Sequence, residues 1–158
     1  MGEAFRPVAW VRSTRAAVVD DGWDAERASI ELDESVPDEA LTGLEAFSHL
    51  LVVFVFDRAS DVPPAPYARH PRANGAWPRV GIFAQRAKDR PNRLGVTTCR
   101  ILEVGPRRVD VEGLDAVDGT PVVDLKPHVA QLAARGTVHQ PAWMDELMVG
   151  YFEVPDPR

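Results

Sequence analysis

Residues 50–56 read LLVVFVF, an apolar run with no polar residue inside it. The run is rich in β-branched and aromatic residues, and a strand built from it has two apolar faces. We therefore expect a central strand that is covered on both sides. The run is far too short to cross a bilayer and no export signal opens the chain, so we expect a cytoplasmic protein that does not act at a membrane.

Further short segments have the composition of strands, and turns containing Gly, Pro or Asp separate them. They are residues 5–13, 28–32, 80–84, 96–104, 109–112 and 121–125. In the first of them, alternation places Val8, Trp10 and Arg12 on one face. Short strands at this spacing are typical of a barrel or a sandwich. The predicted class is mainly β, a small β-barrel with short peripheral helices.

The prolines and the helix signals locate the remaining segments. Residues 59–78 carry five prolines, which excludes a central strand there and predicts a long loop. Helix signals occur at residues 37–47, with Ser35 as the candidate N-cap, and at residues 127–135 and 141–148. We expect a short helix in each of these three segments.

Several familiar sites are absent from the sequence. The single cysteine, Cys99, excludes an internal disulfide and lies in an apolar strand, so we expect it in the core. The four histidines are scattered without metal-ligand spacing, and we expect no metal. Neither a Gly-x-Gly-x-x-Gly loop nor a Gly-Lys-Ser/Thr phosphate loop occurs, which excludes the common nucleotide-binding motifs.

Charge is distributed unevenly along the chain. The total of 18 Lys and Arg against 24 Asp and Glu gives a net charge of −6, which argues against a general nucleic-acid binder. Residues 57–108, however, hold 11 basic and 4 acidic residues. Most of the basic residues are arginines, whose planar guanidinium suits phosphate, carboxylate or base edges. The cluster is either a solvated basic face or a surface for an anionic ligand.

Two loops are candidate binding sites. The first follows the strand at residues 80–84 and contains Arg86, Arg90 and Asn92 before Gly95, which permits close approach of a ligand to the backbone. The second is the turn at residues 114–121, whose backbone groups are free to bind a polar small molecule if the turn is open. The alternatives are that the first loop is only a stiff turn and that the second is only the turn of a β-hairpin, neither of which binds a ligand.

Four segments together resemble the TsaA-like (YaeB-like) family: LEAFSHL at 44–50, VGIFAQR at 80–86, RPNRLG at 90–95 and DAVDGTPVVDLKP at 115–127. The resemblance covers about residues 5–128. It implies a small β-barrel unrelated to Rossmann methyltransferases, which uses S-adenosyl-L-methionine to methylate N6-threonylcarbamoyladenosine in tRNA anticodon loops. It also implies a homodimer with the cofactor near the subunit interface.

The resemblance also implies roles for individual residues. Residues at the family's cofactor-binding positions are Asp57, Arg58, Arg86, Val96, Asp118, Gly119, Thr120, Pro121 and Val122. Here Arg86 is suited to pair with the methionine carboxylate, and backbone groups near Gly119 and Thr120 to receive the adenine or ribose. Candidate contacts to the substrate are Arg69, Arg72, Arg90, Asn92 and Arg93. No catalytic base is assigned, because positioning and desolvation can supply most of the acceleration.

The chain departs from the family pattern at several positions. Asp57 and Arg58 stand where the family usually has His-Gln, and Arg93 and Leu94 replace Pro-Ile. An acidic loop at residues 20–26 replaces the expected Pro-Arg-Gln-Pro-Gly segment, and the additional C-terminal RNA-binding domain of longer members is expected to be absent. We expect these differences to affect tRNA specificity more than cofactor binding.

We divide the chain into a barrel domain at residues 1–128 and a C-terminal helical tail at 129–158, packed on the barrel or on a dimer partner. Two alternatives to tRNA methylation stay open. One is a methyltransferase of a small molecule, suggested by the acidic total charge. The other is a non-catalytic S-adenosylmethionine-binding or interaction module whose tail covers a partner through Trp143, Leu147, Met148, Tyr151 and Phe152.

Overall fold

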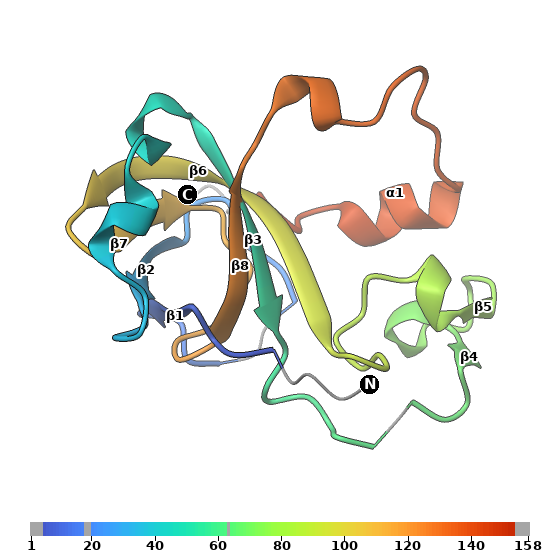
Figure 1. Cartoon of the computed structure of the whole chain (residues 1–158). Coiled ribbons are helices and arrows are strands. Elements are labelled where there is room, and N and C mark those ends of the chain that lie inside the picture. Colours follow the sequence, from blue (N-terminus) through green and yellow to red (C-terminus); the bar gives the residue numbers. More distant parts are fainter. Residues whose placement is uncertain (1–4, 18–19, 63, 154–158) are drawn as a thin grey trace, which may run out of the picture.

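Residues 50–55 of the apolar run lie in β3 (His49–Val55), one of the six strands of a closed barrel. The computed structural model describes residues 5–17, 20–62 and 64–153. Around the barrel the strand order is β1-β2-β7-β6-β3-β8, and every neighbouring pair is antiparallel (Figure 1). The other strands are β1 (Ala9–Ser13), β2 (Arg27–Leu32), β6 (Leu94–Gly105), β7 (Arg108–Glu112) and β8 (Pro121–Pro127). The prediction of a mainly β protein built on a small barrel is confirmed.

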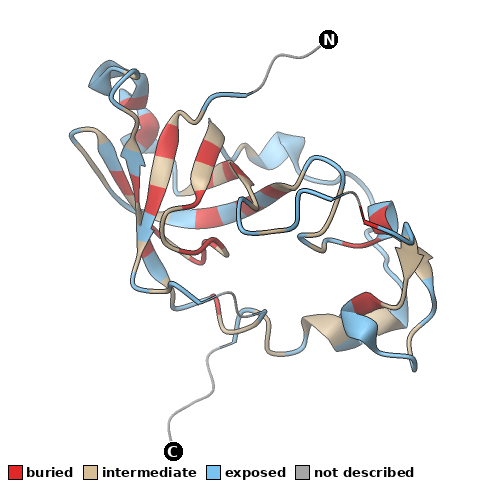
Figure 2. Cartoon of the chain, turned by 90° about the horizontal axis from the view of Figure 1, so that it is seen from below, coloured by how far each residue is buried: buried red, intermediate tan, exposed pale blue. Residues whose placement is uncertain are grey.

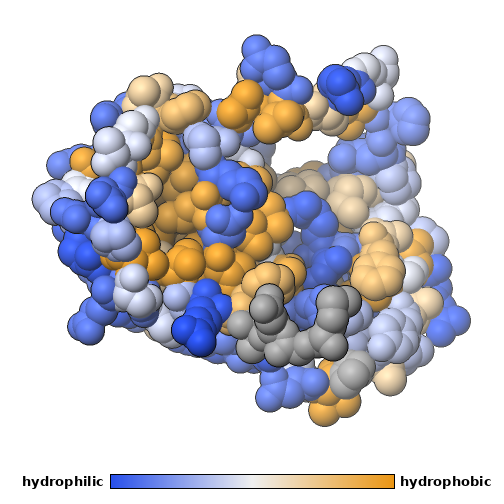
Figure 3. Space-filling view, viewed as in Figure 1, coloured by the Kyte–Doolittle hydropathy of each residue, from blue (hydrophilic) through white to orange (hydrophobic). Residues whose placement is uncertain are grey.

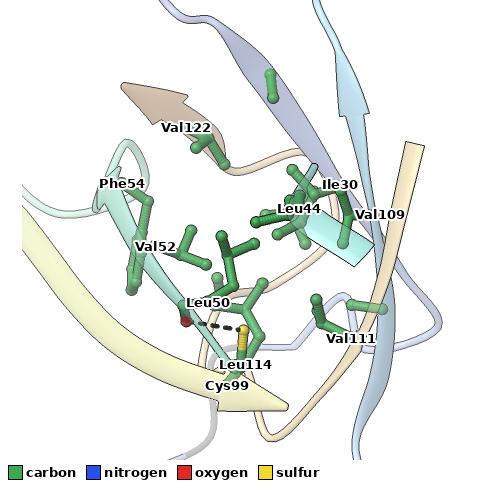
Figure 4. Packing of buried hydrophobic residues seen from close by; sticks show 14 of the residues in the cluster. Ile30, Leu44, Leu50, Val52, Phe54, Cys99, Val109, Val111, Leu114 and Val122 are labelled. Carbon is green, nitrogen blue, oxygen red and sulfur yellow. Dashed lines mark hydrogen bonds between the residues drawn. The ribbon is translucent and has the colours of Figure 1, made fainter. Parts of the chain in front are cut away.

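Alternate side chains of each barrel strand point inward and form the core. In β3 the inward residues Leu50, Val52 and Phe54 are buried, whereas the outward ones are half-buried. The expectation that β3 is covered on both faces is therefore only partly met, because a closed barrel encloses a single face of each strand. Figure 2 shows the buried segments concentrated on the barrel strands, and Figure 4 shows the packing around Leu50.

Two sequence predictions about buried residues can be checked in this core. In β1, Ala9 and Val11 are fully buried, so the face shared by Val8, Trp10 and Arg12 is the outer one. Cys99 is 2% exposed and its thiol donates to the Leu50 carbonyl over 3.5 Å, which confirms its place in the core. Burial raises the pKa of the Cys99 thiol to about 12, so it stays protonated and unreactive near neutral pH.

The ring of Phe54 lies against the backbone of Gly95 inside the barrel, in the space that a side chain at position 95 would need. They are paired across β6 and β3, and a Cβ added at Gly95 would lie 2.4 Å from Cε2 of the Phe54 ring. Such a contact is shorter than any that real Cβ atoms make. Gly95 is therefore required because the ring lies directly on the backbone, and not because the backbone needs a left-handed conformation.

Antiparallel order decides at which end of the barrel each connection lies. Successive strands run in opposite directions, so the connections after β1, β3 and β7 share one end, which we call the loop-rich end. The connections after β2 and β6 lie at the opposite end. The loop-rich end thus collects residues 14–26, 56–93 and 113–120, and these include both loops that the sequence marks as candidate sites.

The connection at residues 56–93 forms a small lobe beside the barrel (Figure 1). It holds the two-stranded pair β4 (Ala68–Arg69) and β5 (Val80–Gly81) and the 3-10 turns η3 (Pro71–Ala73) and η4 (Ile82–Ala84). The predicted long loop at residues 59–78 is thus largely correct. The strand predicted at 80–84 ends at Gly81, because the chain turns there into η4.

The helix predictions have mixed outcomes. The helix at residues 37–47 is replaced by η1 (Asp38–Leu41) and η2 (Leu44–Ala46), separated by Gly43 at φ 89°. Ser35 caps neither turn and hydrogen-bonds to Asp33 instead. The helix predicted at 127–135 is wrong, since β8 continues to Pro127 and only η5 (Ala130–Leu132) follows. The helix predicted at 141–148 is confirmed as α1 (Ala142–Met148).

The chain after β8 returns from the opposite end of the barrel to the loop-rich end. Residues 130–142, which we call the arch, are all exposed, and Figure 3 shows them bridging an open space. Beyond α1, the backbone pairs with the connection after β1: Gly22 and Trp23 donate to the Tyr151 carbonyl over 2.8 and 3.0 Å, and Asp24 donates to Phe152 over 2.8 Å. In the described part of the chain, no helix is long and apolar enough to span a membrane.

The contact between Gly95 and Phe54 predicts a large effect of one added methyl group. We expect Gly95→Ala to lower the free energy of unfolding by about 2 to 3 kcal/mol, because the ring and backbone must separate. The measurement is urea denaturation followed by fluorescence. The control is Gly81→Ala, where an added Cβ has no neighbour within 4 Å and the change should stay within about 0.5 kcal/mol. Equal midpoints for the two variants would contradict the packing.

Candidate functional site

Arg58 connects two segments of the loop-rich end. Its guanidinium donates to the carbonyl of Ala16 over 2.6 Å and to the carbonyl of Asp118 over 2.7 Å. A Cβ at Gly119 would lie 3.9 Å from the same guanidinium. The structure thus brings Arg58 together with the Asp118–Gly119 turn. Both terminal nitrogens of the guanidinium bind protein carbonyls, so Arg58 holds the loops in place. Asp57, the neighbouring candidate, is exposed.

The turn at residues 118–120 uses its own amides internally. The N–H groups of Asp118, Gly119 and Thr120 donate to the carbonyls of Arg15, Val11 and Val117 over 2.8, 2.8 and 3.2 Å. One carboxylate oxygen of Asp118 accepts from the Ser13 amide over 3.0 Å. The expectation that this turn offers free amides is therefore wrong. The groups that this turn can offer to a ligand are therefore acceptor oxygens.

The last three residues of the candidate cofactor turn are less accessible than the sequence suggests. Thr120 is 3% exposed and Val122 is fully buried in the core. Pro121 is paired with Trp10 at the start of β8. A ligand at this turn can therefore contact the side chain of Asp118 and the backbone of Gly119. The Val122 side chain faces the barrel interior.

Arg86 and Val96 meet at the start of β6. The Arg86 guanidinium donates to the Val96 carbonyl over 2.7 Å, and both residues are exposed, Val96 to 38%. This contact fixes one nitrogen of Arg86 and places a cation beside an apolar side chain at the loop-rich end. The two predicted cofactor loops consequently lie at the same end of the barrel, as the prediction requires.

A buried polar cluster at this end was not identified from the sequence. Thr97 and the Tyr151 hydroxyl both donate to the carboxylate of Asp115. Burial, together with the nearby charge of Asp115, raises the pKa of Tyr151 far above its usual range, so the phenol stays protonated and remains a donor. The one signal in the sequence was Thr97, a polar residue between Gly95 and Cys99 on the inward face of an apolar strand.

Tyr151 therefore connects three separate segments. Its hydroxyl binds Asp115 in the connection before β8, its carbonyl binds Gly22 and Trp23 in the connection after β1, and Asp115 binds Thr97 in β6. The Trp23 side chain is 4% exposed, and the Arg15 guanidinium lies 4.1 Å from the centre of its ring. The loop-rich end is thus closed by the C-terminal segment.

The candidate substrate arginines are mostly engaged within the protein. Arg69 lies 3.7 Å from the Asp89 carboxylate, and Arg90 donates to the Gln85 carbonyl over 3.2 Å. Arg72 pairs with Asp21 at 2.8 Å, and this hydrogen-bonded pair raises the pKa of Arg72. Arg93 pairs with Asp61 at 2.6 Å. These four side chains organise the lobe, which the sequence alone did not reveal.

The turn at residues 90–95 also differs from the Pro-Ile form of the family. Arg93 has φ 51°, a left-handed conformation that proline cannot adopt. The turn is therefore built differently in this chain. Asn92 lies exposed beside it and remains a candidate contact.

The structure describes residues 5–17, 20–62 and 64–153. These residues contain no group of three His, Cys, Asp or Glu side chains able to hold a metal ion. His49 hydrogen-bonds to Ser48 over 2.8 Å, and its ring meets the ring of His128 edge to face at a centroid distance of 6.4 Å. Both residues lie near the opposite end of the barrel, His49 at the start of β3 and His128 just after β8.

The cluster around Asp115 predicts a stability effect of one hydroxyl group. Tyr151→Phe keeps the ring and removes the donor, leaving the carboxylate with Thr97 alone. We expect the free energy of unfolding to fall by about 1 to 3 kcal/mol in urea denaturation. Because the folded pKa of Tyr151 is raised, this stabilisation is complete below the usual tyrosine pKa of about 10 and is lost as the pH rises above it.

The matched control for this variant is Tyr67→Phe, which removes the same hydroxyl group from a side chain that is 54% exposed. It should change the stability by no more than about 0.5 kcal/mol. A Tyr151→Phe variant as stable as the wild type at pH 7 would show that the hydroxyl does not hold the C-terminal segment on the barrel.

Comparison with known proteins gives consistent matches. The family described as tRNA-methyltransferase O N-terminal domain matches residues 17–134. A tRNA (adenine(37)-N6)-methyltransferase of Mus musculus is 36% identical over 107 residues, which are 66% of this chain and 24% of the mouse protein. A probable S-adenosyl-L-methionine-binding protein of Archaeoglobus fulgidus is 33% identical over 126 residues, 77% of this chain and 29% of that protein.

A solved structure extends the agreement to the fold. The crystal structure of TrmO from Pseudomonas aeruginosa matches with a TM-score of 0.71 and 29% identity, covering 88% of this chain and 61% of that one. This chain spans less than two thirds of each of these three proteins. The segment matched by the family runs from the connection after β1 to beyond η5 and includes the lobe and the Asp118 turn. The chain therefore belongs to the tRNA-methyltransferase O N-terminal domain family.

Proposed function

We propose that this protein is an S-adenosyl-L-methionine-dependent methyltransferase that modifies an adenosine in tRNA. The observation that carries the proposal is that Arg58 binds the Asp118 turn and Arg86 binds Val96 at the same end of a barrel of this family. The names of the mouse and archaeal relatives, one a tRNA adenine N6-methyltransferase and one a probable S-adenosylmethionine-binding protein, support it.

The residues present fit the chemical groups of the cofactor. The exposed Arg86 keeps N–H donors beyond the one bound to Val96, and these suit the methionine carboxylate. The turn at Asp118 offers acceptor oxygens, which suit the amino group of adenine, the ribose hydroxyls or the methionine ammonium. The exposed Val96 side chain supplies an apolar contact between the two polar regions. Arg86, Val96, Asp118 and Gly119 are therefore the residues proposed to hold the cofactor.

S-adenosylmethionine, when bound, supplies a methyl group on a positively charged sulfur. The tasks of the protein are to hold the acceptor nitrogen in line with that methyl group and to exclude water. Arg58 holds the connections after β1 and β7 against one another, and the cluster of Thr97, Asp115 and Tyr151 secures the same end of the barrel. No residue is assigned as a base, since positioning can supply most of the acceleration.

The acceptor is proposed to be adenosine carrying the threonylcarbamoyl group, in the anticodon loop of tRNA and in the cytoplasm. Among the described residues, Arg79, Arg86 and Lys88 of the lobe have no carboxylate within ion-pair distance, unlike Arg69, Arg72 and Arg93. Cations that the protein does not neutralise suit RNA phosphates or the threonyl carboxylate. Asn92, exposed beside them, is a further proposed contact.

We further propose that the protein is a homodimer, with residues 1–128 as the barrel domain and 129–158 as a tail. The exposed arch supports the dimer, because Leu132 and Val138 are 83% and 68% exposed and a second copy would cover them. The tail also contacts its own barrel through Tyr151. Sedimentation equilibrium should give twice the 17.4 kDa mass of the chain, and Leu132→Asp should lower it towards the monomer. A monomeric wild type would contradict the dimer.

Calorimetry with S-adenosylmethionine tests the function at its first step. We expect the wild type to bind, and Arg86→Ala to bind about 10 to 100 times more weakly because a charge-assisted hydrogen bond is lost. The control is Arg12→Ala, which removes an exposed arginine paired with Glu31 on the barrel. Equal affinity of wild type and Arg86→Ala would remove Arg86 from the site, and no binding by the wild type would refute both methyltransferase hypotheses.

Transfer to an acceptor separates the remaining alternatives. Purified protein is incubated with cofactor and tRNA, and nucleosides are quantified by mass spectrometry. Methylated threonylcarbamoyladenosine should appear with the wild type and decrease strongly with Arg86→Ala. If the protein binds the cofactor but leaves tRNA unmodified, the acceptor is a small molecule or the protein is a non-catalytic binder, and the tRNA assignment is wrong.

A further inference from the structure

A groove between the lobe and α1 shares only Arg86 with the residues proposed to hold the cofactor. Its volume is about 430 Å³, which lies in the range of sites for small molecules and single nucleobases. One wall comes from the lobe and the other from the C-terminal helix. The lining residues used below are Val80, Ala84, Arg86, Trp143, Met144 and Met148. The helical wall lies outside residues 17–134, the segment that the family match covers.

The helical wall is held in position by contacts to the lobe. The indole N–H of Trp77 donates to the Glu146 carboxylate over 2.7 Å, and the Trp77 and Trp143 rings lie 6.5 Å apart at 41°. The Gln140 amide binds the Asp145 carboxylate over 2.6 Å. Both acidic groups of α1 are thus engaged by neutral donors. These contacts hold α1 with Trp143 at the groove, and each carboxylate of α1 accepts a hydrogen bond.

The groove combines a flat apolar interior with a cationic rim. Trp143 supplies an indole, Met144 and Met148 supply thioethers, and these groups favour contact with aromatic rings. On the lobe side, Arg86 lines the groove, Arg79 directly precedes the lining residue Val80, and Lys88 follows Arg86 by two residues. None of the three pairs with a carboxylate in the described chain. Sequence-tolerant binding of single-stranded nucleic acid uses this combination of aromatic rings for bases and cations for phosphates.

The position of Arg86 connects the groove to the proposed methyl-transfer site. Arg86 lines the groove and also donates to Val96 at the loop-rich end of the barrel. A base held in the groove would therefore lie next to the cofactor residues. We propose that this groove binds an unpaired nucleobase of the RNA substrate, stacked on Trp143, with the flanking phosphates on Arg79 and Lys88. The proposal rests on the proposed function, for which it names the surface that receives the RNA.

Two affinities measured on the same variants test the proposal. Fluorescence anisotropy follows a fluorescein-labelled stem-loop RNA with the sequence of a tRNA anticodon arm, and calorimetry follows S-adenosylmethionine. Trp143→Ala removes the ring on which the base stacks, so this variant should bind the RNA about tenfold more weakly than the wild type. Its affinity for the cofactor should change less than about twofold, and its salt dependence of RNA binding should keep the wild-type slope because no charge is removed.

Further variants control for loss of structure. Trp143→Phe keeps an aromatic ring and should restore most of the RNA affinity. Phe47→Ala removes a 39% exposed aromatic residue at the opposite end of the barrel and should bind RNA like the wild type. If Trp143→Ala loses cofactor affinity instead, the groove is part of the cofactor pocket. If it loses the dimer instead, the groove is an interface between copies. Either result, or unchanged RNA affinity, overturns the proposal.

The outcomes also separate this proposal from the proposed function. If RNA binding depends on Trp143 but the protein neither binds the cofactor nor transfers a methyl group, the groove is supported as an RNA site and the proposed methyltransferase function is wrong. Methylation of tRNA that is unaffected by Trp143→Ala would keep the methyltransferase and refute the groove. A wild type that does not bind the RNA would overturn the groove directly.

Discussion

Closure of six antiparallel strands into one barrel decides where every other segment lies. Because neighbouring strands run in opposite directions, the connections alternate between the two ends, and those after β1, β3 and β7 share one of them. The acidic loop, the arginine-rich lobe and the Asp118 turn are far apart in the sequence, yet the topology makes them neighbours. A site at this end needs no nucleotide-binding helix, since strands and their turns supply its scaffold. The arch exists for the same reason: β8 ends at the opposite end, so the chain must travel back along the barrel.

Backbone carbonyls accept hydrogen bonds from several of the arginines that the sequence concentrates in residues 57–108. Arg58 binds two carbonyls of other loops, Arg86 binds one, and Arg90 binds the Gln85 carbonyl. A guanidinium has several donors in a fixed fork, so one side chain can hold a loop and still present N–H groups outward. The lobe has little hydrophobic core of its own, and Figure 2 shows few buried residues in it. Arginine contacts therefore replace apolar packing as the means of fixing its shape.

Local patterns in the sequence predicted the barrel well, and the failures have physical causes. Alternation and turn residues located β1, β2, β3, β7 and β8, because these depend on neighbouring residues. The helix at residues 37–47 failed because Gly43 takes a left-handed conformation, which propensity does not reveal. Both candidate loops lie at one end of the barrel, but the partners of Asp115 and of the Asp118 turn amides were not predicted. Those partners, Tyr151, Val11 and Arg15, come from distant segments, and pairing across the fold is not encoded in spacing.

The packing of the Phe54 ring on the Gly95 backbone limits which amino acids the two positions can hold during evolution. The aromatic ring occupies the volume that any larger residue at position 95 would need, so neither position is free to vary alone. Among descendants of this chain, a larger residue at 95 should occur together with a smaller one at 54. The two positions would then covary, because their side chains share one volume, even though they are distant in sequence.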